Sequence, residues 1–418
     1  MPSTKLFVRL VAALIVFLAM LGACASAQQE VVLHNFSADG KDGFSPASSL
    51  IFDSAGNLYG TTTSGGAHGG GTVFELIPKT GGGWTEKVLY SFRPNGIDGQ
   101  RPVAGLISDA AGNLYGTTEY GGTGGQGIGQ GTVFELSPGP GGVWKEKSLH
   151  SFSYKAGEGY YPFGSLVLDA VGNLFGMTPD GGTDGLCGTV YELTPQLGGS
   201  WNETILLDFD GANGCTPYAG LILDASGNLY GTTFNGGPHG SSFGTVFELS
   251  PQVDGSWNET LLHSFNANGT NCCYPAAALT TNASGNLYST TYGDLALDTG
   301  GTVFELRNEA GTWTEQALHT FIDNGTEGYN SYSGLIFDGS GNLYGTNYNG
   351  GANSYGTAFE LKPTAGGRWT EKILHSFGSG ADGANPIASL ILDSSGNLYG
   401  TTFAGGLYDG GVVFQIKP

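Results

Sequence analysis

The sequence predicts an all-β fold, a seven-bladed β-propeller with four antiparallel strands in each blade. Two internal observations predict it, and the two chain ends add a third. The motif G-N-L-Y/F-G/S-T/M occurs seven times at spacings of 55 to 60 residues, which indicates one repeated supersecondary unit. A glycine-rich stretch and then G-T-V-F-E-L, or a close variant, follow each copy, so each unit holds several short strands. The motifs begin at Gly56, Gly112, Gly172, Gly227, Gly285, Gly341 and Gly396.

The second repeat shows the elements that we expect in every blade. A helical repeat is excluded by the density of glycine and by the β-branched and aromatic runs. Asp109 and Gly112 suit a tight turn between the first two strands, and Pro138 ends the third. Four antiparallel strands per repeat make a propeller blade. The expected elements are an inner strand at 103–108, a turn at 109–113, a second strand at 114–118, a glycine-rich loop at 120–130, a third strand at 131–136 and a fourth strand at 144–152.

The chain ends predict how the ring closes. Small and apolar residues in the first strand of each repeat, as at 48–51, 164–167 and 220–223, suit the crowded axis, and the tryptophan-containing fourth strand suits the outer edge. Residues 31–36 match a fourth strand, whereas residues 412–416 match a third strand. We therefore expect the N-terminal strand to complete the last blade, which removes free sheet edges and ties down both ends.

The N-terminus predicts export. Lys5 and Arg9 precede an apolar stretch at 10–21 that is too short to span a bilayer, and Ala25-Ser26-Ala27 forms a small-residue cleavage site. We therefore expect a signal peptide at 1–27 and a single propeller domain at 28–418, in a secreted or periplasmic protein. A second interpretation stays open, because residues 21–24 resemble a lipobox with Cys24 as the acylated residue. No further transmembrane segment is expected.

Charge and cysteines narrow the function classes. The formal net charge of −21 disfavours binding to nucleic acid or to anionic lipid, and we expect a monomer without a cofactor or a metal. An even number of cysteines besides Cys24 suggests disulfides in an exported protein. Four cysteines allow three pairings, and their spacing does not fit a zinc site. Their places in the repeats predict the bridges Cys187–Cys215 and Cys272–Cys273.

The repeat resembles a known family. The sequence G-N-L-Y-G-T-T, followed by G-G, by G-T-V-F-E-L and by G-G-x-W-x-E-x-x-L-H-S-F, is similar to the GloVer tandem-repeat proteins of exported bacterial chains. The likeness covers residues 31–418. It implies a β-propeller outside the cytoplasm, and because the family carries no established activity it implies no catalytic residues.

Most residues that could carry chemistry are repeated, which favours structural roles. Five histidines share one position of the fourth strand, where other blades have Tyr90 and Leu207, so we expect packing residues. Fourth strands of different blades are also expected to point away from one another. We expect the repeated glutamates to form cross-strand hydrogen bonds or pairs with lysine and threonine. The repeated aspartates of the D-x-x-G-N turn offer too few oxygens for calcium, and we expect them to be turn formers.

Function is expected where the copies differ. The loops between the second and third strands and those between blades share one face, which collects irregular tyrosines and carboxylates. Exposed tyrosines near carboxylates suit a sugar or peptide surface, because each ring offers an apolar face and a hydroxyl. The candidate ligand-binding residues are Tyr120, Tyr160, Tyr161, Asp180, Asp184, Tyr218, Tyr274, Asp294, Asp298, Tyr329 and Tyr332.

The leading hypothesis is an exported, non-catalytic propeller that binds a carbohydrate or a protein partner through this loop face. One alternative is a secreted carbohydrate-active lyase or hydrolase in which loop carboxylates act as acid and base. A purely structural envelope protein is the other alternative. No catalytic residue is assigned, because no G-x-S-x-G elbow or phosphate-binding loop is present and no triad stands out from the repeats.

Overall fold

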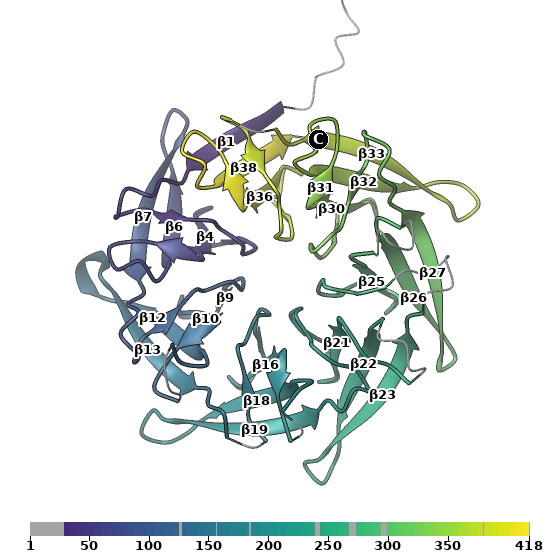
Figure 1. Cartoon of the computed structure of the whole chain (residues 1–418), viewed down its shortest axis with the longest axis horizontal. Helices are drawn as coiled ribbons and strands as arrows, with labels where there is room; N and C mark the ends of the chain where they lie inside the picture. The colour runs from purple at the N-terminus through teal and green to yellow at the C-terminus, as the bar shows by residue number, and fades with distance from the viewer. Residues whose placement is uncertain are drawn as a thin grey trace, which may run out of the picture.

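Seven four-stranded antiparallel sheets are arranged as blades around a common axis (Figure 1). The structure, a computed structural model, describes residues 29–124, 128–155, 157–183, 185–238, 243–266, 273–293, 299–378 and 380–417. The predicted fold class is confirmed. Within these ranges no helix is long and apolar enough to cross a bilayer, and the helical segment present is the 3-10 turn η1 (Pro140–Gly142).

The innermost strands are shorter than predicted. Each has two residues, so that Ser48 and Ser49, which were expected in the first strand, lie outside the sheet. Near the axis such residues bond to the neighbouring blade instead: the Ser389 N–H donates to Ser49 Oγ at 3.1 Å. The innermost strands are β3 (Ile51–Phe52), β9 (Ile107–Ser108), β15 (Val167–Leu168), β20 (Ile222–Leu223), β24 (Thr280–Thr281), β29 (Ile336–Phe337) and β35 (Ile391–Leu392).

The second and third strands form the buried middle of each blade. In the second strands a glycine usually faces the third-strand aromatic ring: a Cβ on Gly60 would lie 2.7 Å from Phe74 Cζ. The second strands are β4 (Leu58–Thr62), β10 (Leu114–Thr118), β16 (Leu174–Thr178), β21 (Leu229–Thr233), β25 (Leu287–Thr290), β30 (Leu343–Asn347) and β36 (Leu398–Thr402). The third strands are β6 (Thr72–Pro78), β12 (Thr132–Pro138), β18 (Thr189–Pro195), β22 (Thr245–Pro251), β26 (Thr302–Glu309), β32 (Thr357–Pro363) and β38 (Val412–Lys417).

The N-terminal strand closes the ring, as predicted. It supplies the outer strand of the last blade by pairing antiparallel with β38, from Gln29 opposite Lys417 to Asn35 opposite Val412 (Figure 1). The two chain ends therefore lie in one sheet. The outer strands are β7 (Trp84–Ser91), β13 (Trp144–Ser151), β19 (Trp201–Asp208), β23 (Trp257–Ser264), β27 (Thr312–Thr320), β33 (Trp369–Ser376) and β1 (Gln29–Asn35).

The hydrophobic core lies between consecutive blades. One cluster joins Phe92 of the first blade to Leu106 and Phe134 of the second, and another joins Phe36 of the last blade to Leu50 and Phe74 of the first. Edge-to-face aromatic contacts recur at these junctions: the ring centroids of Phe92 and Phe134 are 5.1 Å apart, and those of Phe36 and Phe74 are 5.0 Å apart. The phenylalanine of L-H-S-F thus packs on the aromatic residue of the next blade, and closing the ring buries the last such pair.

The repeated aspartates are turn formers, as expected. Asp53 Oδ1 accepts the N–H groups of Ala55 and Asn57 at 2.8 Å each, and Asp53 Oδ2 accepts from the Tyr59 hydroxyl at 3.1 Å. Tyr59 also donates to Glu75 on β6 at 2.9 Å. Glu75, Glu248, Glu305 and Glu360 are held by such cross-strand hydrogen bonds, as predicted, and in these blades the turn is locked to the sheet.

The loops on one face are more ordered than predicted. Residues expected as a glycine-rich loop, such as Tyr120 and Gly121, pair with the segment that enters the same blade and form a two-stranded sheet. In the fourth blade a single bridge between Cys215 and Asn235 takes its place. The paired strands are β2 (Gly43–Phe44) with β5 (Ser64–Gly65), β8 (Gly99–Gln100) with β11 (Tyr120–Gly121), β14 (Gly159–Tyr160) with β17 (Asp180–Gly181), β28 (Gly328–Tyr329) with β31 (Asn349–Gly350), and β34 (Gly383–Ala384) with β37 (Ala404–Gly405).

Candidate ligand-binding site at the mouth of the central channel

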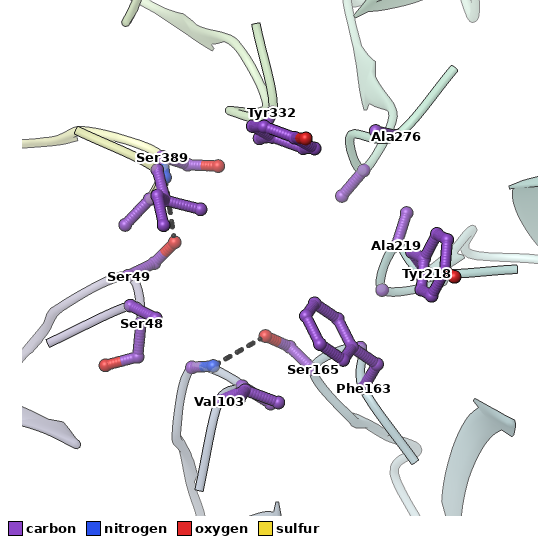
Figure 2. A pocket seen from close by; sticks show the side chains of 18 of the residues that line it. Ser48, Ser49, Val103, Phe163, Ser165, Tyr218, Ala219, Ala276, Tyr332 and Ser389 are labelled. Carbon is purple, nitrogen blue, oxygen red and sulfur yellow. Dashed lines mark hydrogen bonds between the residues drawn. The ribbon is translucent and has the colours of Figure 1, made fainter. Parts of the chain in front are cut away.

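A cavity of about 580 Å³ lies where the loops that enter all seven blades converge (Figure 2). One repeat position contributes a lining residue from every blade. It lies three residues before the buried leucine that directly precedes the inner strand, and proline comes before it in six blades. Its occupant varies between small, aliphatic and aromatic residues, so the cavity is asymmetric although its frame is repeated. The seven residues are Ala47, Val103, Phe163, Tyr218, Ala276, Tyr332 and Ile387.

A second repeat position adds a further layer of lining residues. It follows the last residue of the second strand, where the chain leaves the sheet toward the loop face. Aromatic residues occupy it in three of the four blades that contribute to the cavity. These residues are Thr63, Phe234, Tyr348 and Phe403.

A residue in the left-handed backbone region holds these two positions together in every blade except the third, where Pro179 has no N–H to donate. In the fourth blade Thr216 has a φ of 59°, its N–H donates to the Cys187 carbonyl of the previous blade at 2.9 Å, and its carbonyl accepts from Phe234 N–H at 3.1 Å. Non-glycine residues adopt this conformation at a cost of about 1 to 2 kcal/mol. Its recurrence means that the frame enforces it where lining residues are delivered. The same position is held by Ser45, Arg101, Tyr161, Thr216, Tyr274, Asn330 and Asn385.

Aromatic rings form an arc around one side of the mouth. Phe163 and Tyr218 have ring centroids 5.4 Å apart, and Tyr218 and Phe234 are 5.6 Å apart. Tyr292 continues the arc, 6.3 Å from Phe234 and 4.8 Å from Tyr332. Phe163 and Tyr332 are 36% and 37% exposed, so they present ring surface to a ligand. The arc spans the third to the sixth blade.

The hydroxyls of Tyr218 and Tyr332 stay protonated at neutral pH. Burial, followed by the charges of Asp180 and Glu119, raises the pKa of Tyr218. Burial and the hydrogen bond with Tyr292 raise the pKa of Tyr332. Both groups are therefore hydrogen-bond donors and acceptors at neutral pH rather than bases.

Small residues around the axis set the depth of the cavity. The Gly105 N–H donates to Ser165 Oγ of the next blade at 3.0 Å (Figure 2). The Gly334 N–H likewise donates to Ser389 Oγ at 2.8 Å. A Cβ on Gly164 would lie 2.1 Å from the Ala219 carbonyl oxygen, so this close approach requires glycine. Contacts between neighbouring blades therefore fix the positions of the small residues that line the cavity next to the aromatic arc.

The lining carries one charged side chain among the described residues. Arg101 Nη1 lies 3.0 Å from Glu119 Oε2, and its guanidinium carbon lies 5.8 Å from the Tyr120 ring centroid. No described carboxylate lines the cavity. The surface offered to a ligand is therefore mostly apolar and aromatic, with hydroxyl and backbone groups as its polar partners, as in many small-molecule sites.

The predicted tyrosines fall into separate places. Tyr218 and Tyr332 line the cavity, and Tyr274 stacks on Phe234 with centroids 5.0 Å apart. Tyr329 lies in β28 opposite Asn349 and packs against the core between the fifth and sixth blades. It does not line the cavity.

Tyr120, Tyr160 and Tyr161 form a second aromatic cluster, away from the cavity lining. Tyr161 lies 5.3 Å from Tyr120 and 5.0 Å from Tyr160 between ring centroids, and its hydroxyl bonds to that of Tyr154. Asp180 pairs with Tyr160 through β17 and β14, and burial raises its pKa. These residues share the loop face but do not converge on the channel.

Several predicted residues lie outside the described ranges. These are Asp184, Asp294, Asp298 and Cys272, so the Cys272–Cys273 bridge stays a prediction. The Cys187–Cys215 disulfide is confirmed, with Cα atoms 4.3 Å apart. It ties a loop of the third blade to the residue before Thr216.

Sequence reasoning missed Phe163, Phe234, Tyr348, Phe403 and Arg101. The signal was available: aligning the repeats on the residue after proline and on the residue after the second strand exposes two variable columns. The predicted tyrosines include members of the first column, such as Tyr218 and Tyr332, together with tyrosines at neighbouring positions that do not line the cavity, such as Tyr329.

Comparisons with known proteins establish the family. A family model described as Gloeobacter/Verrucomicrobia repeat matches residues 23–138, 87–300 and 278–418, and the chain belongs to this family. A search of curated proteins found no significant match. Similar solved structures include an ulvan lyase of a new polysaccharide lyase family. Its structure without a named ligand is 11% identical with a TM-score of 0.56, and its structure bound to the saccharide GlcA(1-4)Rha3S is 10% identical with a TM-score of 0.55.

Each of these two matches covers 92% of this chain and 95% of the other. An α-L-arabinanase from Penicillium chrysogenum in complex with arabinobiose is 14% identical over 75% of this chain and 91% of the other, with a TM-score of 0.45. At these identities the similarity shows the propeller fold alone.

Proposed function

We propose that this member of the Gloeobacter/Verrucomicrobia repeat family is an exported, non-catalytic propeller that binds a carbohydrate at the mouth of its central channel. Export is supported by the signal-like segment 1–27 and by the Cys187–Cys215 disulfide, with 28–418 as the mature, monomeric domain. A lipid anchor on Cys24 is compatible with the same role.

The convergence of four aromatic residues on one cavity carries the proposal. Phe163, Tyr218, Phe234 and Tyr332 come from three blades and form most of one wall. Rigid aromatic side chains provide a large contact area at low entropic cost, and tyrosine adds a hydroxyl for hydrogen bonds. A saccharide presents both apolar C–H faces and hydroxyl groups, so it matches this lining better than a highly charged ligand does.

The same lining disfavours catalysis. Glycoside hydrolysis commonly needs two carboxyl groups flanking the scissile bond, about 5 to 9.5 Å apart. The cavity has no such pair among its described residues, and the raised pKa values of Tyr218 and Tyr332 oppose their use as bases. A lyase or hydrolase is the alternative that the experiment below distinguishes.

The test combines binding with turnover. Oligosaccharides from a glycan array would be titrated into the purified protein by calorimetry, and the same mixtures would be assayed for new reducing ends and unsaturated products. We expect binding without products, and at least about a tenfold loss of affinity in Phe234→Ala, because a central aromatic contact contributes more than about 1 kcal/mol. Tyr120→Ala, which removes a ring of the second cluster, is the matched control.

Turnover that is lost in Asp180→Asn would favour the enzyme. Equal binding by the Phe234→Ala protein and the Tyr120→Ala protein would move the site away from the channel. A protein that neither binds nor turns over any glycan would support a structural role in the envelope.

A further inference from the structure

The outer strands of neighbouring blades bring chemistry-bearing side chains together, which the sequence analysis excluded. His319 lies on β27 of the fifth blade, Glu371 lies on β33 of the sixth, and Glu327 lies in the loop between these blades. His319 Nε2 is 3.6 Å from Glu327 Oε2 and 3.7 Å from Glu371 Oε2. The expectation that these strands point away from one another was therefore wrong, because side chains of adjacent outer strands meet at the junction between blades.

The three groups face one another without hydrogen bonds. His319 Nε2, Glu327 Oε2 and Glu371 Oε1 are buried atoms that have no hydrogen-bond partner, since separations of 3.6 Å and more are too long for one. The Glu371 side chain is 8% exposed. No described lysine or arginine forms an ion pair with either glutamate. Buried polar atoms are normally satisfied, so this group of three points to a missing partner.

We propose that His319, Glu327 and Glu371 bind a divalent transition metal ion of the zinc class at the outer junction between the fifth and sixth blades. Zinc takes histidine nitrogen and carboxylate oxygen at about 2.0 to 2.2 Å, which places tetrahedral ligand atoms about 3.3 to 3.6 Å apart. The separation of 3.6 Å from His319 to Glu327 falls at the end of this range, and that of 3.7 Å to Glu371 lies just beyond it. Three protein ligands leave the fourth position to water.

The residues around His319, Glu327 and Glu371 favour the binding of a cation between them. Asn324 Nδ2 donates to Glu327 Oε1 at 3.0 Å, which leaves Oε2 of the same carboxylate facing the histidine. A metal ion binds the neutral imidazole and the ionised carboxylate, so protons compete with it for these ligands and binding is expected to weaken as the pH falls.

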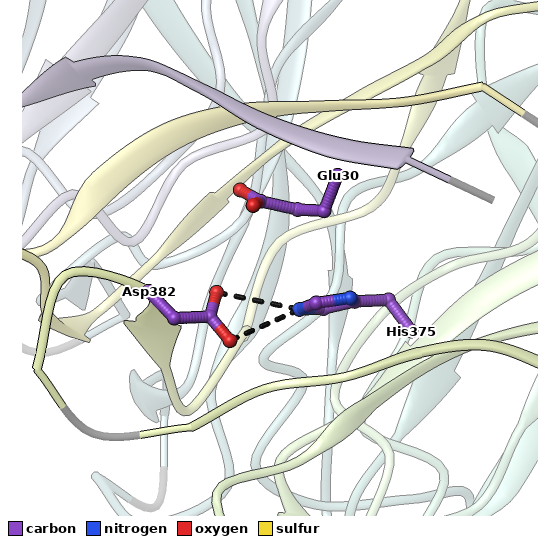
Figure 3. A group of neighbouring side chains, drawn as sticks. All are labelled: Glu30, His375 and Asp382. Carbon is purple, nitrogen blue, oxygen red and sulfur yellow. Dashed lines mark hydrogen bonds and ion pairs between the residues drawn. The ribbon is translucent and has the colours of Figure 1, made fainter. Parts of the chain in front are cut away.

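Other junctions show why this one is the strongest candidate. Glu30, His375 and Asp382 repeat the arrangement between the last two blades, but His375 Nε2 already bonds to both Asp382 oxygens at 3.1 and 3.3 Å (Figure 3). At the first junction, tyrosine replaces histidine: the Tyr90 hydroxyl donates to Asp98 at 2.8 Å, with Glu146 beside it. That junction has the acidic pair without the nitrogen ligand and serves as a built-in control.

The experiment uses untagged protein that has been stripped with a chelator, because a histidine tag would bind the probe. Cobalt(II) alone would be titrated and followed by its visible absorption, which is intense in tetrahedral sites, and zinc binding would be measured by calorimetry. We expect one site with the tetrahedral spectrum and affinity that falls from pH 8 to pH 6. Glu371→Gln and His319→Leu should each weaken binding by at least about 100-fold, since even indirect partners of a metal contribute 10- to 100-fold.

Leucine occupies the repeat position of His319 in the third blade, as Leu207, so His319→Leu is expected to fold. Glu146→Gln, at the repeat position of Glu371, should bind cobalt as the unaltered protein does. Failure to bind cobalt or zinc at pH 8 would overturn the proposal and leave a shared proton as the partner of these groups. Equal affinity in the Glu371→Gln and Glu146→Gln proteins would overturn it as well.

Discussion

The glutamates at the blade junctions make the stability of the propeller depend on pH in a direction that the structure determines. The perimeter glutamates, each two residues after the outer-strand tryptophan or at the matching position of β1, have pKa values raised to about 7, mainly by burial. The folded protein therefore keeps protons that the unfolded chain releases near pH 4.5. The contribution of these protonated glutamates to the free energy of unfolding is complete below about pH 4.5 and is lost as the pH rises toward 7. The perimeter glutamates are Glu30, Glu86, Glu146, Glu203 and Glu371.

The magnitude follows from the size of the change. A pKa change of one unit corresponds to 1.36 kcal/mol, so raising the pKa from 4.5 to about 7 amounts to about 3 kcal/mol for each glutamate. Access of water at the perimeter reduces this to about 1 kcal/mol. Five groups give about 5 kcal/mol. Unfolding entropies near 2.1 cal/mol/K per residue convert this to about 6 °C in a chain of this size. Histidines oppose the trend below pH 6.5, because burial lowers the pKa of His263 to about 4 and also lowers that of His150.

Replacing all five perimeter glutamates with glutamine isolates their effect, because glutamine mimics the protonated acid and leaves the histidines in place. In chelator-containing buffer, calorimetry should give equal melting temperatures for the two proteins at pH 4 and a melting temperature about 6 °C higher for the variant at pH 8. Glu309→Gln, at an exposed site, shows the effect of removing one negative charge without a buried carboxyl group. A gap that stays constant with pH, or one in which the variant is less stable at pH 8, would refute the reasoning.

Three further predictions concern the frame. Phe92→Ala should destabilise the protein by about 3 to 5 kcal/mol, because Phe92 is fully buried against Phe134 of the next blade; denaturant titration would measure this, and a loss below about 1 kcal/mol would contradict the junction core. Replacing Cys187 and Cys215 together with serine should lower stability by about 3 to 4 kcal/mol, since the bridge closes a loop with a sequence separation of 28 residues. Equal melting temperatures for the unaltered protein before and after treatment with a reductant would argue against that bridge. Thr216→Gly should raise stability by about 1 kcal/mol by relieving the left-handed conformation of a β-branched residue, and a decrease measured by the same titration would mean that the threonine side chain outweighs the backbone cost.

The blade count, the strand order and the ring closure could be predicted because each depends on features present in every copy. Asp53, Tyr59 and Glu75 lock the turn to the sheet in the first blade, and equivalent residues recur around the ring. The match between the two chain ends and complementary strands predicted that β1 completes the last blade. Periodicity alone does not give the length of an inner strand. Those strands are short because the serine and glycine residues near the axis bond across blades, a three-dimensional constraint that no single repeat records.

The same limit applied to the perimeter histidines. Repetition across His150, His263 and His319 argued for packing, and their rings do pack on the phenylalanine two residues later, at centroid distances of 4.6 to 5.0 Å. The junction with the next blade adds carboxylates that lie 50 or more residues away in the sequence. Strand alternation gives the face that a side chain occupies but not which residues of the adjacent blade meet it.

Both candidate sites arise where a fixed frame leaves one position free. At the channel mouth, the left-handed residue is held by backbone hydrogen bonds, so the side chain two residues later can change from Ala276 to Tyr332 without disturbing the turn. At the perimeter, the packing contact with phenylalanine is compatible with either histidine or Tyr90, so the acidic pair beside it can acquire or lose a nitrogen ligand. Exact repetition would make either site sevenfold and therefore unselective. Asymmetry introduced at these positions concentrates aromatic rings in the third to sixth blades and brings His319, Glu327 and Glu371 together at the junction of the fifth and sixth, and this allows a repeated scaffold to bind specific ligands.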